Sequence, residues 1–246
     1  MMRTFAGTIL IAAAISLGGL GCSRLPGKPG FRPETLRPDQ TTDFAALYKA
    51  NCSACHGERG TGGPALPLRN PVYLAWAGHD HLAQVVSKGV PHELMPAFAQ
   101  SAGGMLTSQQ VEDLVNGMLS NWGDPSVLNG IHAPSYTAST QGDPSRGKQA
   151  FQTFCARCHG ADGQGVQGGG AHVSGSIVDP SYLALISDQG LRDIVVAGMP
   201  GEQMPDWRHD GAQPMTDKEV DDVVAWLASN RIAYPGQPFA TTQQQQ

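Results

Sequence analysis

The sequence is poor in charged and aromatic residues, which make up only 15% and 7% of its 246 positions. Basic side chains are also scarcer than acidic ones, with 16 Lys and Arg against 21 Asp and Glu. This negative balance argues against nucleic acid or an anionic lipid surface as a partner, and favours a partner with a basic docking patch. Beyond position 22, no run is apolar enough to span a bilayer, which takes about 20 residues.

The longest apolar run lies at the N-terminus, where Arg3 precedes apolar residues from Phe5 to about Leu17. A short positive region, an apolar region and then small residues predict a signal peptide over 1–21. Cys22 resembles the acylated first residue of a bacterial lipoprotein, although Gly19 stands where such signals usually have leucine. We therefore expect export to the periplasmic side of the membrane and anchoring through a lipid on Cys22. The alternative is an ordinary signal peptide that leaves Cys22 as a spare thiol.

Three further segments have the composition of connections. Residues 22–41 carry prolines at 26, 29, 33 and 38, which predict a semi-rigid tether with a reach of up to roughly 60 Å. Residues 123–142 are rich in Pro, Gly, Ser and Thr and predict a linker. The run of glutamines at the C-terminus predicts a disordered tail over 235–246.

The chain has only five cysteines, and four of them lie in two C-x-x-C-H pentapeptides. The first pairs Cys52 and Cys55 with His56, and the second begins 103 residues later at Cys155 and ends with Cys158 and His159. This spacing is the attachment signature of c-type haem, with the cysteines as thioethers and the histidine as an axial iron ligand. A zinc site would need a second ligand pair, and no further cysteine follows either motif. A thioredoxin-like pair has no need of the trailing histidine.

An internal repeat defines two domains. Downstream of the haem motifs the halves align at an offset of 109, so that Pro71-Val72-Tyr73-Leu74 matches Pro180-Ser181-Tyr182-Leu183. Thr107 with Gln110, and Thr216 with Glu219, predict capping boxes at the start of two closing helices. The predicted domains cover 42–122 and 143–234. Each is small and poor in aromatic residues, so we expect haem to supply much of its apolar core.

The repeat also indicates the second iron ligand. Met95-Pro96 and Met204-Pro205 fall at equivalent positions in loops rich in Gly and Pro. A thioether is a suitable sixth ligand for haem iron, so Met95 and Met204 are the candidates opposite His56 and His159. Met199 is a weaker candidate because its partner position is a valine. The six other histidines are not repeated and are expected at the surface; they are His79, His81, His92, His132, His172 and His209.

Each half resembles a class I cytochrome c domain. The resemblance rests on a first helix, C-x-x-C-H-G, a Gly-rich loop, the Met-Pro and a closing helix, and it covers nearly all of 42–234. It implies an all-α fold of two tandem domains, each wrapped around one covalent haem c. It also implies that the first and last helices cross through a glycine and an aromatic residue, as Gly147 and Phe151 facing Trp226 would do in domain 2.

Domain 1 departs from that pattern, with Phe44 in place of the glycine and Gly117 in place of the tryptophan, while Tyr48 is retained. We predict a size swap that conserves the volume at the crossing. The family also has a proline whose carbonyl orients the ligand histidine. Pro64 or Pro67 could supply this carbonyl in domain 1. Domain 2 has no proline before Pro180, so an unrelated backbone carbonyl is expected for His159, and the two haems should differ in potential.

The resulting prediction is a non-enzymatic carrier of single electrons between a membrane or periplasmic reductase or dehydrogenase and a terminal acceptor. It needs redox protein partners and no small-molecule substrate. Two alternatives stay open: a dihaem peroxidase-like enzyme, and a permanent cytochrome subunit of a larger dehydrogenase or oxidase.

Overall fold

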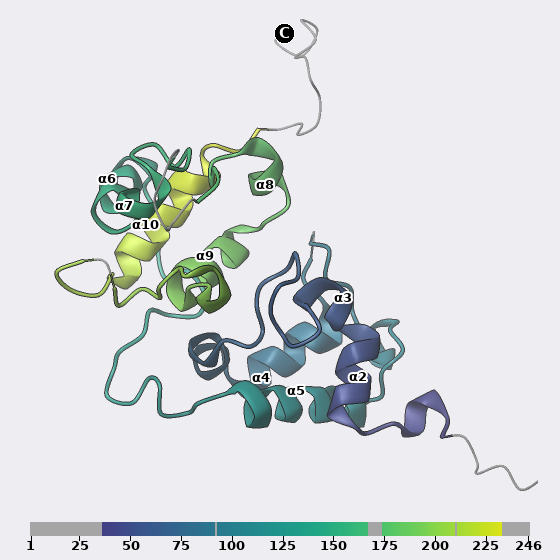
Figure 1. The fold of residues 1–246 in the computed structure, drawn as a ribbon. Helices are drawn as coiled ribbons and strands as arrows, with labels where there is room; N and C mark the ends of the chain where they lie inside the picture. The colour runs from purple at the N-terminus through teal and green to yellow at the C-terminus, as the bar shows by residue number, and fades with distance from the viewer. Residues whose placement is uncertain (1–35, 92, 167–173, 210, 233–246) are drawn as a thin grey trace, which may run out of the picture. The chain divides into compact units, whose positions relative to one another are not determined.

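The computed structural model describes residues 36–91, 93–166, 174–209 and 211–232, coloured in Figure 1. The predicted signal peptide, most of the tether and the C-terminal tail lie outside these residues. Within them the regular structure is helical, apart from two isolated β-bridges, which confirms the predicted all-α class. None of the helices so described has the length and apolar character needed to cross a membrane. The short turn η2 (Pro38–Gln40) precedes one compact unit that begins at Thr41.

Figure 1 shows the helices of domain 1, and the three longest of them begin at side-chain caps. The Asp43 side chain accepts a hydrogen bond from the Ala46 N–H. Asn70, the residue before Pro71, accepts hydrogen bonds from the N–H groups of the second and third residues of α4. The predicted capping box of Thr107 and Gln110 is confirmed. The elements are α2 (Phe44–Asn51), α3 (Ser53–His56), α4 (Pro71–Lys88), η3 (Gln100–Ala102) and α5 (Ser108–Trp122).

Domain 2 repeats this order with one helix divided. Where α4 has a break at Gly78, whose φ is 73°, the repeat places Ser187, which caps a separate helix. The second capping box, of Thr216 and Glu219, is also confirmed. The elements are α6 (Pro144–Phe154), α7 (Ala156–His159), α8 (Pro180–Ala184), α9 (Asp188–Ala197), η4 (Pro200–Glu202) and α10 (Asp217–Ala228).

The closing helices bury the faces that their apolar periodicity predicts. In α5 the buried apolar side chains are Val111, Leu114, Val115 and Met118, and in α10 they include Val220, Val223, Val224 and Leu227. Each closing helix packs against the first helix of its own domain, α5 on α2 and α10 on α6. These two crossings support the ends of α2 and α6, where the haem motifs begin.

The predicted size swap at the crossings is confirmed. Phe44 lies over Gly117 so closely that a Cβ at position 117 would overlap its ring. In domain 2 the arrangement is reversed, because Gly147 lies against Trp226 and the Phe151 and Trp226 rings are 4.4 Å apart. A third ring in domain 1 was not predicted: Trp122 packs edge-on against both Phe44 and Tyr48.

The predicted linker contains no helix, yet side chains of other segments bind part of it. The Trp76 Nε1–H donates to the Pro134 carbonyl at 2.6 Å, and the Arg192 guanidinium donates to the carbonyls of Ser135 and Tyr136. Farther along, the Thr140 N–H donates to the Asp221 carboxylate at 3.0 Å. The stretch 134–140 is therefore attached to the helices rather than free.

Candidate haem sites

Both C-x-x-C-H motifs form the same turn. Cys52 ends α2 and caps α3, just as Cys155 ends α6 and caps α7. The N–H of the ligand histidine donates to the carbonyl of the first cysteine at 3.0 Å in both motifs, which fixes the two cysteines and the histidine on one short turn. The four motif cysteines, Cys52, Cys55, Cys155 and Cys158, are not joined in disulfides and can form thioethers.

The motif residues suit covalent haem. Burial lowers the pKa of both His56 and His159 from the ordinary value, so each imidazole is neutral near pH 7, the form that binds iron. Haem bound here would supply an iron that takes up and releases one electron. The described residues hold no group of three or more His, Cys, Asp and Glu placed to bind a metal ion by themselves.

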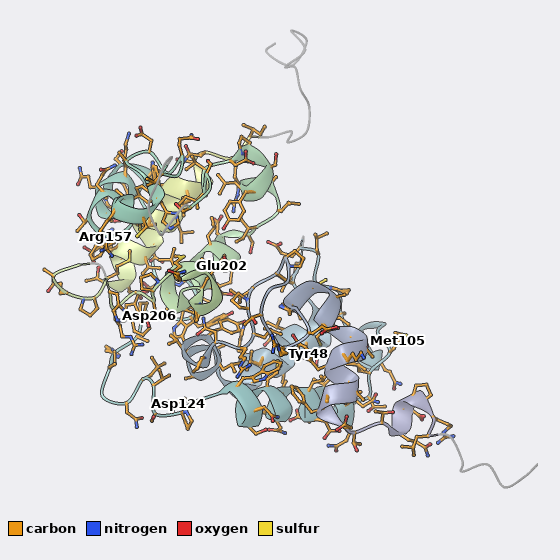
Figure 2. All side chains as sticks on the ribbon, in the orientation of Figure 1. Tyr48, Met105, Asp124, Arg157, Glu202 and Asp206 are labelled. Atoms are coloured by element: carbon orange, nitrogen blue, oxygen red, sulfur yellow. The ribbon has the colours of Figure 1, made fainter. Side chains whose placement is uncertain are left out.

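A glycine follows each ligand histidine and turns the chain sharply. Gly57 and Gly160 have φ of 79° and 76°, and a Cβ on Gly57 would overlap the Thr61 carbonyl. In domain 1 the Tyr48 hydroxyl, on a residue labelled in Figure 2, donates to the Gly57 carbonyl at 2.9 Å. Phe151 holds the equivalent position in domain 2 and has no hydroxyl, so this bond belongs to domain 1 alone.

The two candidate methionines lie on loops of the same construction. The Val90 N–H donates to the Met95 carbonyl at 3.0 Å, and the Met199 N–H donates to the Met204 carbonyl at 2.9 Å. Met95 and Met204 are both half-buried. The assignment of these methionines as iron ligands therefore stays a prediction, carried by two equivalent loops. Met199, the weaker candidate, provides the backbone N–H that holds the Met204 loop.

Each methionine loop passes close to a glycine at the end of the preceding helix. Gly89 and Gly198 have φ of 69° and 67°. A Cβ on Gly89 would stand 2.6 Å from the Met95 carbonyl oxygen, and one on Gly198 would stand 2.7 Å from that of Met204. A larger residue at either position would push the methionine loop away.

The ligand histidines differ at Nδ1. His56 Nδ1 lies 2.7 Å from the Leu66 carbonyl oxygen, so the acceptor is neither Pro64 nor Pro67. The expectation was wrong by one residue: Pro67 restricts the backbone of Leu66, the residue before it, and so directs the Leu66 carbonyl. His159 Nδ1 is buried and has no hydrogen-bond partner in the part of the chain that the structure describes. The backbone carbonyl that was expected to accept the His159 N–H is therefore not found among the described residues.

Of the other histidines, His92 and His172 lie outside the described residues, and His132 and His209 are exposed as expected. His81 is not a simple surface residue, because its ring stacks 3.9 Å from that of Tyr136 and its Nε2 is buried. Sequence reasoning also missed Ser174, whose hydroxyl donates to the Cys158 carbonyl at 2.6 Å. The available signal was a hydroxyl residue at the repeat position of Ala65.

Comparisons with known proteins agree with this geometry. Residues 144–231 match the family "Cytochrome c", and residues 39–116 match "Cytochrome C oxidase, cbb3-type, subunit III". The chain therefore carries two tandem cytochrome c domains, which makes it a dihaem cytochrome with two covalently bound haem c groups.

Two similar curated proteins are named as oxidase subunits. The cbb3-type cytochrome c oxidase subunit FixP of Sinorhizobium medicae is 32% identical over 130 residues, which cover 49% of this chain and 39% of that protein. The subunit FixPc of Rhizobium leguminosarum bv. viciae is 28% identical over 181 residues, or 70% of this chain and 56% of that protein. The chain thus spans about half the length of these relatives. Among solved structures, the Kuenenia stuttgartiensis reducing HAO-like protein complex aligns over 82% of this chain and all of its own, with a TM-score of 0.44 and 18% identity.

Proposed function

We propose that this chain transfers single electrons from a membrane or periplasmic reductase or dehydrogenase to a terminal acceptor. The observation that carries the proposal is the duplication of a complete site. Each C-x-x-C-H turn is accompanied by a methionine loop held by the same backbone hydrogen bond, Val90 to Met95 in domain 1 and Met199 to Met204 in domain 2. Such a site can exchange electrons without binding a substrate at the iron.

The proposed ligands are His56 with Met95 and His159 with Met204, with thioethers from the four motif cysteines. Ligation by His and Met raises the reduction potential of haem and fills both axial positions. This arrangement disfavours the peroxidase alternative, because peroxide needs an open or displaceable position on one iron. If the purified dihaem protein turned over peroxide at an enzymatic rate, the carrier proposal would be overturned.

The proposed acceptor is a terminal oxidase. Its support is that the two relatives from Sinorhizobium medicae and Rhizobium leguminosarum bv. viciae are named as subunits of cbb3-type cytochrome c oxidase. The chain could either shuttle to such an oxidase or stay bound to it as a subunit. In both cases the net negative charge of the chain suits a partner with a basic docking patch.

Purification of the native protein in mild detergent tests these partners. Co-purification of an oxidase in fixed proportion is expected for a subunit. A pure monomer that reduces an added oxidase is expected for a shuttle, and a protein that gives no electrons to an oxidase in either form contradicts the proposal.

Membrane attachment is proposed through a lipid on Cys22, after removal of residues 1–21. Mass spectrometry of the mature N-terminus should find an acylated cysteine, and Cys22→Ser should release the protein into the periplasmic fraction with both haems in place. Recovery of the Cys22→Ser protein in the membrane fraction, at the wild-type proportion, would contradict the lipid anchor.

A further inference from the structure

The two ligand histidines have unequal surroundings at the nitrogen that does not face the iron. His56 Nδ1 lies 2.7 Å from the Leu66 carbonyl oxygen, a short bond for an N–H donor. His159 Nδ1 is buried, yet it has no partner among the described residues. A buried N–H without an acceptor is rare and costly. We therefore look for the cause of this difference in the loops that follow the two haem motifs.

In domain 1 the loop after the haem motif is fixed by its backbone. The Ala65 N–H donates to the Cys55 carbonyl at 2.9 Å, one residue before the acceptor Leu66. Pro67 is buried and restricts Leu66 to an extended backbone conformation. The Leu66 carbonyl is thereby held towards the His56 ring.

In domain 2 the corresponding loop is attached differently. At the repeat offset of 109, Ser174, Gly175 and Ser176 replace Ala65, Leu66 and Pro67. The Ser174 hydroxyl, not a backbone N–H, now donates to the Cys158 carbonyl. The Gly175 carbonyl oxygen lies beside Gly165, 3.2 Å from where a Cβ of Gly165 would stand. The carbonyl of Gly175, at the position equivalent to Leu66, makes no hydrogen bond with His159 Nδ1.

This difference has a direct consequence for the iron. A hydrogen bond from the outer N–H makes a ligand imidazole a stronger electron donor, which favours the more highly charged, oxidised iron. Without that bond, His159 donates less and favours the reduced iron. Arg157, labelled in Figure 2, adds a positive charge inside the second haem motif where the first has Ala54, and it acts in the same direction.

The acidic surface of domain 2 acts in the opposite direction. Residues 142–234 contain seven Lys and Arg against twelve Asp and Glu, whereas residues 43–122 contain four against six. Exposed charges are largely screened beyond a Debye length of about 10 Å at 0.1 M salt. The Nδ1 bond, by contrast, is made by the iron ligand itself, so its effect should be larger.

We propose that His159 holds the haem of higher potential, so that domain 1 receives the electron and domain 2 delivers it. One electron moves from the haem on His56, which thereby becomes oxidised, to the haem on His159, which thereby becomes reduced. No bond is formed or broken. His56 and Leu66 act as the pair that lowers the potential of the first haem. The inference rests on the proposed function, since it gives that electron path a direction.

Stepwise oxidation of the isotope-labelled dihaem protein, followed by NMR, tests the order. Resonances assigned through His56 and His159 report separately which haem is still reduced. We expect the half-reduced protein to keep its electron on the His159 haem at least tenfold more often, equivalent to 59 mV for a one-electron couple. Equal occupancy, or a preference for the His56 haem, overturns the proposal.

The same sample tests the cause. The Nδ1–H of His56 should exchange slowly with solvent deuterium and show the shift of a strong hydrogen bond, whereas that of His159 should not. Equal protection of the two protons overturns the assignment of the difference to this bond. Neither measurement involves electron delivery to an oxidase, so a failure of the proposed function is detected separately by oxidase assays.

A matched pair of variants isolates the loop. Pro67→Ala releases the restriction on Leu66 and should raise the potential of the His56 haem while the His159 haem keeps its own. Ser176→Ala, at the repeat-equivalent position, should change neither potential. A Pro67→Ala protein with slow exchange at His56 Nδ1–H lost and both potentials unchanged contradicts the proposed role of the bond.

Discussion

Phe44 covers Gly117 where α2 crosses α5, and domain 2 exchanges the two sizes by setting Trp226 against Gly147. Any side chain at position 117 must displace the Phe44 ring. We expect overpacking in Gly117→Ala to lower the free energy of unfolding of domain 1 by about 1–3 kcal/mol. The better helix propensity of alanine should offset up to about 1 kcal/mol of this loss. Gly117→Trp should cost more.

Denaturant unfolding of the holoprotein, followed by the absorbance of the haems, measures this cost. The Phe44→Ala background provides the control, because removing the ring should remove most of the penalty at position 117. If Gly117→Ala costs the same in both backgrounds, the crossing is not packed as described.

The methionine loops depend on glycines that have positive φ. Gly198→Ala would force a Cβ to within 2.7 Å of the Met204 carbonyl oxygen, and Gly89→Ala would do the same beside Met95. Each variant should weaken methionine ligation on one haem only, seen as loss of half of the near-infrared band that marks the bond between methionine sulfur and oxidised iron. Gly201→Ala, where a Cβ meets no atom within 4 Å, should keep the full band. Retention of the full band in Gly198→Ala would argue against this role for the glycine.

Burial of Asp193 in α9 makes domain 2 sensitive to pH. Asp193 is only 7% exposed, and burial raises the pKa of its carboxyl group to about 7, although the Tyr136 hydroxyl, the Gln189 amide and the Arg192 guanidinium favour the charged form. The folded protein therefore keeps a proton that the unfolded chain, with a pKa of about 3.9, has already released. The contribution of this carboxyl group to stability is complete below about pH 4, and it is lost as the pH rises to about 7.

The slope of that loss is at most about 1.4 kcal/mol per pH unit. Denaturation of the wild type and of Asp193→Asn, compared from pH 5 to pH 8, isolates it. The difference in stability should move in favour of Asp193→Asn as the pH rises, and it should level off above about pH 7. Parallel curves would show that Asp193 does not carry the effect.

Arg192 joins the linker to α10. It is 2% exposed, forms ion pairs with Asp217 and Asp221, and donates to two linker carbonyls. Arg192→Met leaves the buried Asp221 carboxylate without its cation, which should cost about 3–5 kcal/mol. It should also expose residues 134–140 to limited proteolysis, whereas the exposed Arg59→Met should change stability by less than about 0.5 kcal/mol. Wild-type stability and protease resistance in Arg192→Met would contradict this role.

The features predictable from the sequence are local and repeated. The capping box of Thr107 and Gln110 and the buried stripe of α5 depend on residues three or four positions apart, so they can be recognised in the chain itself. The exchange of Phe44 and Gly117 required only the comparison of two copies.

Other features depend on tertiary structure. Arg192 lies among the buried residues of α9, and its burial depends on Asp221 and on carbonyls more than fifty residues away. The Leu66 acceptor was missed by one residue, because a carbonyl direction depends on backbone torsions that residue identity alone does not give. The lack of a partner for His159 Nδ1 among the described residues depends in the same way on how the loop around Gly175 is attached.

We propose that each iron has one histidine and one methionine ligand, and the near-infrared methionine band of single variants measures this ligation. Met95→Ala and Met204→Ala should each remove half of the band, and the double variant should remove all of it. Met105→Leu, at an 80% exposed position labelled in Figure 2, and Met199→Leu should leave it intact. A full band in Met95→Ala or in Met204→Ala would show that another group binds that iron, and would contradict the account.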